Sequence, residues 1–188
     1  MNDLASNAPG SNMFATNAGL VTSNGPHGPN VMTAAWTHQI SYEPPLVMVN
    51  GEVGDATLEN ILATKEFGVN LASDSQNVLS SVSGKYSGKK VDKISLLKEL
   101  GFEFYEGEKI KVPMVKGAAL NVELRLIKQE PMGDHVILIG EVLKTSVNES
   151  LQPVVYTGGK YWKLGESLQK PEQKVLDKIT ELGEKYKK

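Results

Sequence analysis

The stretch AALNVELRLI, residues 118–127, alternates apolar and polar side chains along most of its length. Leucine and valine fall on one face of an extended chain, and asparagine, glutamate and arginine fall on the other. This period of two predicts a β-strand with one buried face, as antiparallel sheets have. Further strands are expected at residues 14–23, 31–40, 46–50, 67–71, 135–144, 154–157 and 160–164.

The order of these strands predicts a mainly β fold. Most of them follow one another directly, and Gly158-Gly159 fits a two-residue hairpin turn. We therefore expect a closed antiparallel β-barrel with peripheral helices, since closure leaves no exposed sheet edge. Helices are expected over residues 57–65, after an Asp55 cap, and after Asp92. The Ser- and Gly-rich residues 78–86 predict a loop with one helical turn.

The chain length of 188 residues fits one domain. Residues 1–12 are rich in Asn, Ser, Ala, Gly and Pro and predict a flexible N-terminal arm, and residues 13–188 are expected to form the domain. Pro171 can open a last helix, over about residues 171–187. Its apolar face packs either on the body of the domain or on a second copy of the chain, and the first interpretation is favoured.

Composition excludes several kinds of chemistry. The chain has no cysteine, which rules out disulfides, thiolate metal sites and a cysteine nucleophile. Its only arginine is Arg125, so a bound phosphate must be held by lysine, hydroxyl groups or backbone N–H groups. A net charge of −2 argues against nucleic-acid binding, and three histidines without metal-ligand spacing argue against a metal site. Without an apolar run of membrane length or a signal-peptide pattern, we expect a cytoplasmic protein with no membrane attachment.

The segment Asn30-Val31-Met32-Thr33-Ala34-Ala35-Trp36 is unusual for a strand. Its small side chains let a flat ligand approach the backbone, while Asn30 and Thr33 can hydrogen-bond the edge of that ligand. Trp36 can then form a wall of the site. The alternative interpretation is a sheet whose small residues lie under a helix.

Seven short motifs follow one another along the chain. They are the segment at residues 30–36, Ser41-Tyr42-Glu43-Pro44-Pro45-Leu46-Val47, Thr57 at a helix start, Glu66-Phe67-Gly68-Val69-Asn70, Ser83-Gly84, Val91-Asp92-Lys93 and Gly133-Asp134-His135. In this order and spacing they resemble the flavin reductase-like family, the FMN-binding split barrels that include flavoredoxins and archaeal ferric reductases. The resemblance covers about residues 14–165, and it depends on the whole set, since each motif alone is weak.

The resemblance implies a split β-barrel homodimer that binds one FMN per subunit near the dimer interface. It implies an oxidoreductase that accepts hydride from NADH or NADPH onto FMN and passes electrons to a redox partner protein, a monooxygenase or another acceptor. The alternative is an FMN-binding electron-transfer protein, similar to flavoredoxin, without its own nicotinamide site. The single arginine argues against a strong preference for NADPH, whose extra phosphate is often held by arginine.

By resemblance, the FMN ring lies against residues 30–36. The alternative for these residues is sheet packing or, for the tryptophan, a place in the core. Asn50 and Gly51 would let the tail of FMN pass close to the backbone, or they form an ordinary turn. The residues expected to contact or line the ring are Asn30, Met32, Thr33, Ala34, Ala35 and Trp36.

The phosphate of FMN is expected at Thr57, Ser83 and Lys93. Thr57 begins a helix, whose free N–H groups and dipole favour an anion. The resemblance assigns Lys93 as the cation, and Ser83 could add a hydrogen bond. The alternatives are local capping roles for the two hydroxyl residues and a positive charge supplied by a lysine between residues 85 and 90.

His135 and Tyr161 complete the candidate site. His135 could contact the flavin or orient the nicotinamide, without acting as a general base, or it is a structural histidine at a strand start. Tyr161 could reach the flavin from the C-terminal hairpin, or it packs within that hairpin. Glu52 and Asp55 depart from the family pattern and would oppose phosphate binding unless they point away from the phosphate.

Overall fold

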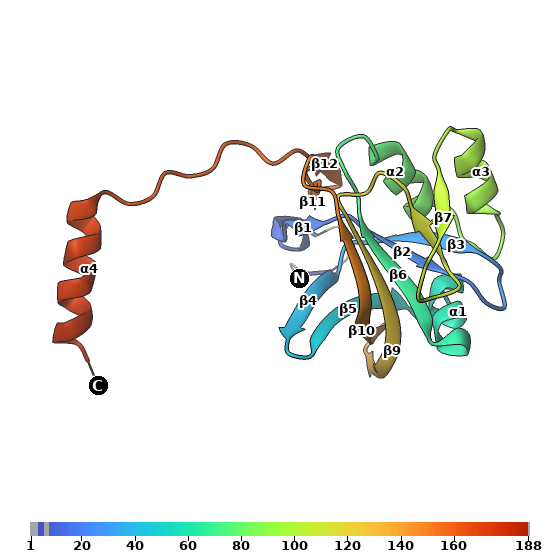
Figure 1. Ribbon diagram of the computed structural model, residues 1–188, viewed down its shortest axis with the longest axis horizontal. Helices are drawn as coiled ribbons and strands as arrows, with labels where there is room; N and C mark the ends of the chain where they lie inside the picture. Colours follow the sequence, from blue (N-terminus) through green and yellow to red (C-terminus); the bar gives the residue numbers. More distant parts are fainter. Residues whose placement is uncertain (1–3, 6–7, 188) are drawn as a thin grey trace.

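A seven-stranded antiparallel sheet dominates the computed structural model, which describes residues 4–5 and 8–187 (Figure 1). The strands lie in the order β3-β2-β6-β9-β10-β5-β4. Their bounds are β2 (Gly19–Ser23), β3 (Asn30–Ala34), β4 (Thr37–Tyr42), β5 (Pro45–Glu52), β6 (Glu66–Leu71), β9 (Leu120–Met132) and β10 (His135–Val147). The prediction of a mainly β fold with peripheral helices is confirmed.

The two edges of this sheet meet at one place in the chain. β3 and β4 lie at opposite edges, yet only Ala35 and Trp36 separate them in sequence. The sheet therefore curls until the Asn50 N–H of β5 donates to the Trp36 carbonyl at 3.0 Å. Within the described ranges no ladder joins β3 to β4, so the barrel is split there rather than fully closed.

The sequence predicts one strand over residues 31–40, and this is wrong because the backbone turns between β3 and β4. The Thr37 Oγ1 donates to the Ala34 carbonyl at 3.1 Å across the turn. A Cβ on Gly19 of β2 would lie 2.6 Å from the same Thr37 oxygen, so the close approach requires glycine. The turn is what places small side chains at the mouth of the barrel.

The main core fills the inside of the curled sheet. α1 (Ala56–Thr64) covers part of it and contributes Leu58 and Ile61. A Cβ on Gly140 of β10 would lie 2.6 Å from the Phe67 ring, so glycine lets that ring sit against the strand. The largest fully buried side chains of this core are Ile61, Phe67, Leu124 and Leu138.

The first half of β9 is buried on both faces, which corrects the prediction of one polar, solvated face. A hairpin that the sequence did not predict, β7 (Phe104–Glu106) with β8 (Pro113–Val115), belongs to the segment that covers this face. The Glu123 side chain, which is 4% exposed, accepts from the backbone N–H groups of Glu108 at 3.1 Å and Lys109 at 2.6 Å. The alternation of residue types is real, but the polar members bind a neighbouring segment instead of water.

α2 (Asn77–Lys85) stands where the sequence predicts a loop. Its serines are not loop residues here, because Ser80 and Ser83 are buried. The small side chains let the helix lie close to β3, where Thr33 Oγ1 donates to the Ser80 carbonyl at 2.6 Å. The next helix, α3 (Lys93–Glu99), is confirmed, and Asp92 caps it by accepting from the Ser95 N–H at 3.0 Å.

The C-terminal region carries a small sheet and a separate helix. β1 (Thr16–Asn17), β11 (Val155–Thr157) and β12 (Lys160–Trp162) form the sheet, and the predicted turn at Gly158-Gly159 is confirmed. An extended segment then leads to α4 (Gln173–Lys185), which lies away from the barrel (Figure 1).

The expected packing of this last helix on the domain body is wrong, because no residue of α4 is buried. Contact of its apolar face with a second copy stays a prediction. The arm expected over residues 1–12 falls partly outside the described residues, and its described end includes the short turn η1 (Ser11–Met13). None of the helices in the described chain has the length and apolar character of a membrane span.

Asn70 offers a test of this packing. Its Oδ1 accepts from Asn121 Nδ2 at 2.6 Å and from the Val115 N–H at 3.0 Å, and its Nδ2 donates to the Leu20 carbonyl at 2.8 Å. Asn70→Ala leaves these buried groups unpaired, so we expect the free energy of unfolding to fall by about 3 kcal/mol in urea titrations. The exposed Gln129→Ala of β9 should change it by less than about 0.5 kcal/mol. Equal effects of the two substitutions would contradict this role of Asn70.

Candidate functional site

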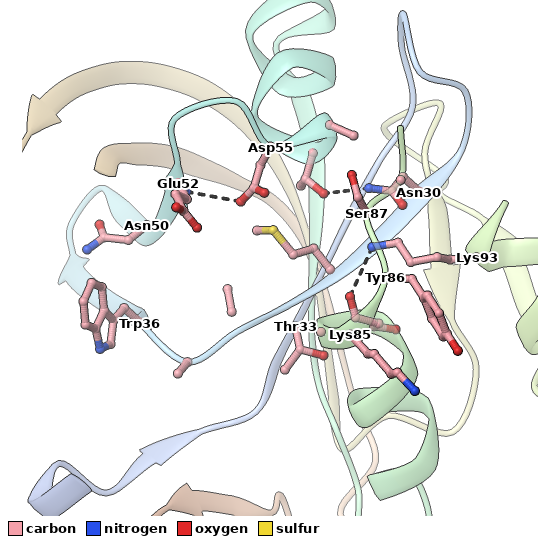
Figure 2. Close-up of a pocket in the computed structure, with 18 of the residues that line it drawn as sticks. Asn30, Thr33, Trp36, Asn50, Glu52, Asp55, Lys85, Tyr86, Ser87 and Lys93 are labelled. Carbon is pink, nitrogen blue, oxygen red and sulfur yellow. Dashed lines mark hydrogen bonds between the residues drawn. The ribbon is translucent and has the colours of Figure 1, made fainter. Parts of the chain in front are cut away.

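A cavity of about 440 Å³ opens beside the split in the barrel (Figure 2). Its wall is built from β3 and the turn after it, the end of β5, the start of α1, the end of α2 with the segment after it, and the starts of α3 and β10. Eleven of the residues expected from the sequence line it: Asn30, Met32, Thr33, Ala34, Ala35, Trp36, Asn50, Thr57, Ser83, Lys93 and His135.

Two expected residues are not in this wall. Gly51 is buried in β5, and a Cβ there would point to Leu58 of the core at 3.5 Å. Tyr161 lines a neighbouring cavity of about 430 Å³. Its ring contacts the Tyr156 ring of the adjacent strand, with the centroids 5.2 Å apart and the ring planes tilted by 52°. Packing within the hairpin is therefore the interpretation of Tyr161 that the structure supports.

The sequence prediction committed no residue of one side of the cavity to the site, although it named the lysines between residues 85 and 90 as alternatives for the cation. Residues 84–88, directly after the expected Ser83, form this side, and Glu52, Asp55 and Ala56 complete the wall. A Cβ on Gly88 would lie 2.5 Å from Asn30 Oδ1, so the segment crosses close to the Asn30 amide. The run of glycine, serine and lysine over residues 84–89 was the available signal, but its approach to β3 depends on the unpredicted helix α2.

Three polar atoms of the cavity wall are buried without a hydrogen-bond partner in the described structure. They are Asn30 Oδ1, Asn50 Oδ1 and Ser83 Oγ. Buried polar atoms are nearly always paired, so these three are available to a ligand. Asn30 Nδ2 donates to Thr57 Oγ1 at 2.8 Å, which leaves the proton of the Thr57 hydroxyl free to be donated.

Lys93 places a buried positive charge at the same end of the cavity. Its side chain is 2% exposed, and its Nζ donates to the Ser83 carbonyl at 3.1 Å. Within the described residues no carboxylate lies in ion-pair distance of this ammonium group, and burial lowers the pKa of Lys93 to about 8. A buried ammonium without an anionic partner is costly, so this end of the cavity is suited to an anion.

The first turn of α1 adds further donors at this end. Thr57 lies in that turn, and no side chain in the described part of the chain caps the N–H groups of the turn. The Asp55 carboxylate instead accepts from the Glu52 N–H at 3.2 Å, within its own loop (Figure 2). Burial holds the pKa of Asp55 above its ordinary value, although the Glu52 N–H and the nearby Lys93 favour the ionised form. The helix start therefore presents free N–H groups, which favour an anion.

The other end of the cavity is aromatic. Figure 2 shows Trp36 and Asn50 on the side away from Lys93. The Trp36 and His135 ring centroids are 4.9 Å apart, and His135 Nδ1 contacts Asp134 Oδ1 at 2.7 Å. No group of three metal-ligating side chains occurs in the described ranges. The cavity thus joins an aromatic end to a cationic end through a floor of small residues.

The chain is similar to several known proteins. It is 27% identical over 148 residues to the FMN reductase (NADH) SmoA of Agrobacterium fabrum. That match covers 79% of each chain. It is 25% identical over 130 residues to the reductase component of the FADH(2)-dependent resorcinol hydroxylase of Rhizobium sp., with 69% of each chain covered.

Among solved structures, the flavoredoxin of Desulfovibrio vulgaris (Miyazaki F) is similar with a TM-score of 0.74 and 27% identity. That match covers 85% of this chain and 92% of the flavoredoxin. The family model described as the flavin reductase like domain matches residues 11–165. This range contains the whole curled sheet and the cavity, and the chain belongs to the flavin reductase-like family.

Proposed function

We propose that this protein binds FMN in the cavity, accepts hydride from NADH or NADPH onto it, and passes electrons to an acceptor. The observation that carries the proposal is the distribution of chemistry along the cavity. An aromatic end, a floor of small residues and a cationic end with unpartnered donors suit a flat ring with a phosphorylated tail. When bound, the flavin supplies the redox chemistry, and the protein supplies binding, orientation and electrostatics.

The proposed ring end uses the turn between β3 and β4. Ala34 and Ala35 leave room for a ring to approach the backbone, and Trp36 stands beside it. The unpartnered Asn50 Oδ1 can accept a hydrogen bond from a ring N–H. His135 is proposed to orient the ring or the nicotinamide, since its contact with Trp36 places it at this end.

The proposed phosphate end uses lysine and hydroxyl groups. Lys93 supplies the charge, and Thr57 and Ser83 supply O–H donors next to the start of α1. Arg125 takes no part, because it pairs with Glu141 on the outside of the sheet. This agrees with the expectation that a chain with one arginine holds phosphate by other groups.

The names of the similar proteins support the activity and a partner enzyme. SmoA is named as an NADH-dependent FMN reductase, and the Rhizobium protein is named as the reductase component of a hydroxylase. We propose on this basis that an oxygenase or another redox protein takes the electrons. We also propose a homodimer with FMN near the interface, because Trp36 is 51% exposed at the cavity and a second subunit could cover it.

The flavoredoxin similarity keeps a second function open, that of an electron carrier without its own nicotinamide site. Visible spectra after addition of FMN and then of NADH or NADPH separate the two functions. Rapid bleaching of the flavin band with either nicotinamide is the expected result. Bleaching only with a reduced partner protein supports the carrier, and failure to bind FMN contradicts both functions.

Removal of the Lys93 charge tests the phosphate end. We expect Lys93→Met to weaken FMN binding roughly 10- to 100-fold, the size of one lost charge-assisted hydrogen bond. Riboflavin lacks the phosphate, so its affinity should stay unchanged in fluorescence titrations. The exposed Lys128→Met of β9 is the matched control, and it should bind both ligands as the wild type does.

The pH dependence of binding follows from the pKa of Lys93, which is about 8. The charged lysine binds phosphate, so FMN affinity should fall about tenfold between pH 7 and pH 9. Unfolding does not cause this loss, because a lysine with a lowered folded-state pKa makes the folded state more stable as the pH rises past 8. A flat FMN profile in the wild type, or a fall that persists in Lys93→Met, would contradict the assignment.

A further inference from the structure

Three charged or titratable side chains meet on the outside of the phosphate end. Glu59 of α1 uses both carboxylate oxygens. Its Oε2 lies 2.5 Å from His27 Nε2, and its Oε1 lies 2.6 Å from Lys89 Nζ. His27 belongs to the turn between β2 and β3, and Lys89 belongs to the segment after α2. Hydrogen bonds from Lys89 and His27 hold the pKa of Glu59 below its ordinary value, so the carboxylate is ionised at neutral pH.

The turn that carries His27 and the segment that carries Lys89 depend on Glu59 to different degrees. The His27 turn is also held by Asn60, whose Oδ1 accepts from the His27 N–H at 2.9 Å and whose Nδ2 donates to the Gly28 carbonyl at 2.9 Å. In the described structure, the other hydrogen bonds of residues 87–91 lie within this segment. The backbone N–H groups of residues 89–91 all donate to oxygen atoms of Ser87. The Glu59–Lys89 pair is therefore the polar link between that segment and α1.

The same segment forms the wall of the phosphate end. Gly88 crosses the Asn30 amide so closely that a Cβ would lie 2.5 Å from Asn30 Oδ1. Gly88 also lines a second cavity of about 450 Å³, together with Lys89, Lys90 and Lys98. A thin wall, held by Glu59 through Lys89, thus separates the proposed phosphate site from a lysine-lined space.

We propose that Glu59, His27 and Lys89 form a clamp that closes this wall behind the phosphate of a flavin mononucleotide. Glu59 is a positioning residue, since it acts on the ligand through the segment that it holds. The inference rests on the proposed function, because it takes the phosphate to lie at Lys93 and Thr57.

The clamp bears on the choice between FMN and FAD. FAD continues beyond its first phosphate with a second phosphate and an adenosine, and the closed wall stands beside the end of the mononucleotide. To bind, FAD must either displace this wall or place its second phosphate and adenosine outside the cavity. When the clamp opens, the second phosphate can reach Lys89, Lys90 and Lys98 across the position of Gly88. The intact clamp should therefore favour the mononucleotide.

Flavin dissociation rates provide the test. In stopped-flow displacement, Glu59→Ala should release FMN about three- to tenfold faster than the wild type, the range that one or two partly exposed ion pairs can supply. Its ratio of FAD to FMN dissociation constants should fall. Riboflavin should leave at the wild-type rate, because it has no phosphate at the wall.

Matched variants separate positioning from loss of stability. Lys89→Met should reproduce the faster FMN release of Glu59→Ala, and Lys89→Arg should keep FMN release slow because it keeps the charge. Glu103→Ala removes a comparable exposed ion pair, Lys116–Glu103 at 2.7 Å, away from the cavity and should release FMN at the wild-type rate. Unchanged FMN release in Glu59→Ala, or equally faster riboflavin release, overturns the clamp. A wild-type protein that binds no flavin instead overturns the proposed function.

Discussion

The two-residue connection between β3 and β4 is the constraint on which the site depends. These strands occupy opposite edges of a seven-stranded sheet, so a link of Ala35 and Trp36 is possible only if the sheet curls until its edges meet. The link carries no ladder of its own, and the barrel stays split beside it. A cavity at this point is a direct consequence, because the backbone turns away while the neighbouring elements α1 and α2 remain packed.

The cavity keeps polar groups that would normally be satisfied within the fold. Asn30 Oδ1, Asn50 Oδ1 and Ser83 Oγ are buried without partners in the described structure, and Lys93 is a buried ammonium. Each is unfavourable for the folded state on its own. Among the described residues, three of the four unpartnered buried side-chain atoms line this cavity, and the fourth, Asn17 Oδ1, lies outside it. Their concentration beside a buried ammonium is the reason to treat the three as binding groups.

The sequence anticipated the sheet and most of the cavity wall, but for different reasons. The alternation at residues 118–127 marks a strand through local geometry. Most site residues from Asn30 to His135 came from a resemblance in order and spacing, and the chemistry of residues 30–36 and Thr57 pointed the same way. Errors arose where a partner element changes the meaning of a residue. Ser80 and Ser83 suggest a loop until β3 lies beside them, and Glu123 suggests a solvated face until residues 108–109 cover it. Gly88 has a function in the wall only because α2 brings it to Asn30.

The charges at the phosphate end show why lysine can replace arginine here. A guanidinium would bring five fixed donors and a permanent charge, whereas the Lys93 ammonium is a compact charge whose pKa burial has already lowered to about 8. An anion beside it would raise that pKa and remove the cost of burial, so binding and protonation support each other. Donors on Thr57 and Ser83 then supply the directionality that arginine would have provided. The same linkage makes the folded state more stable when the anion is bound, because the unfolded chain offers no such arrangement.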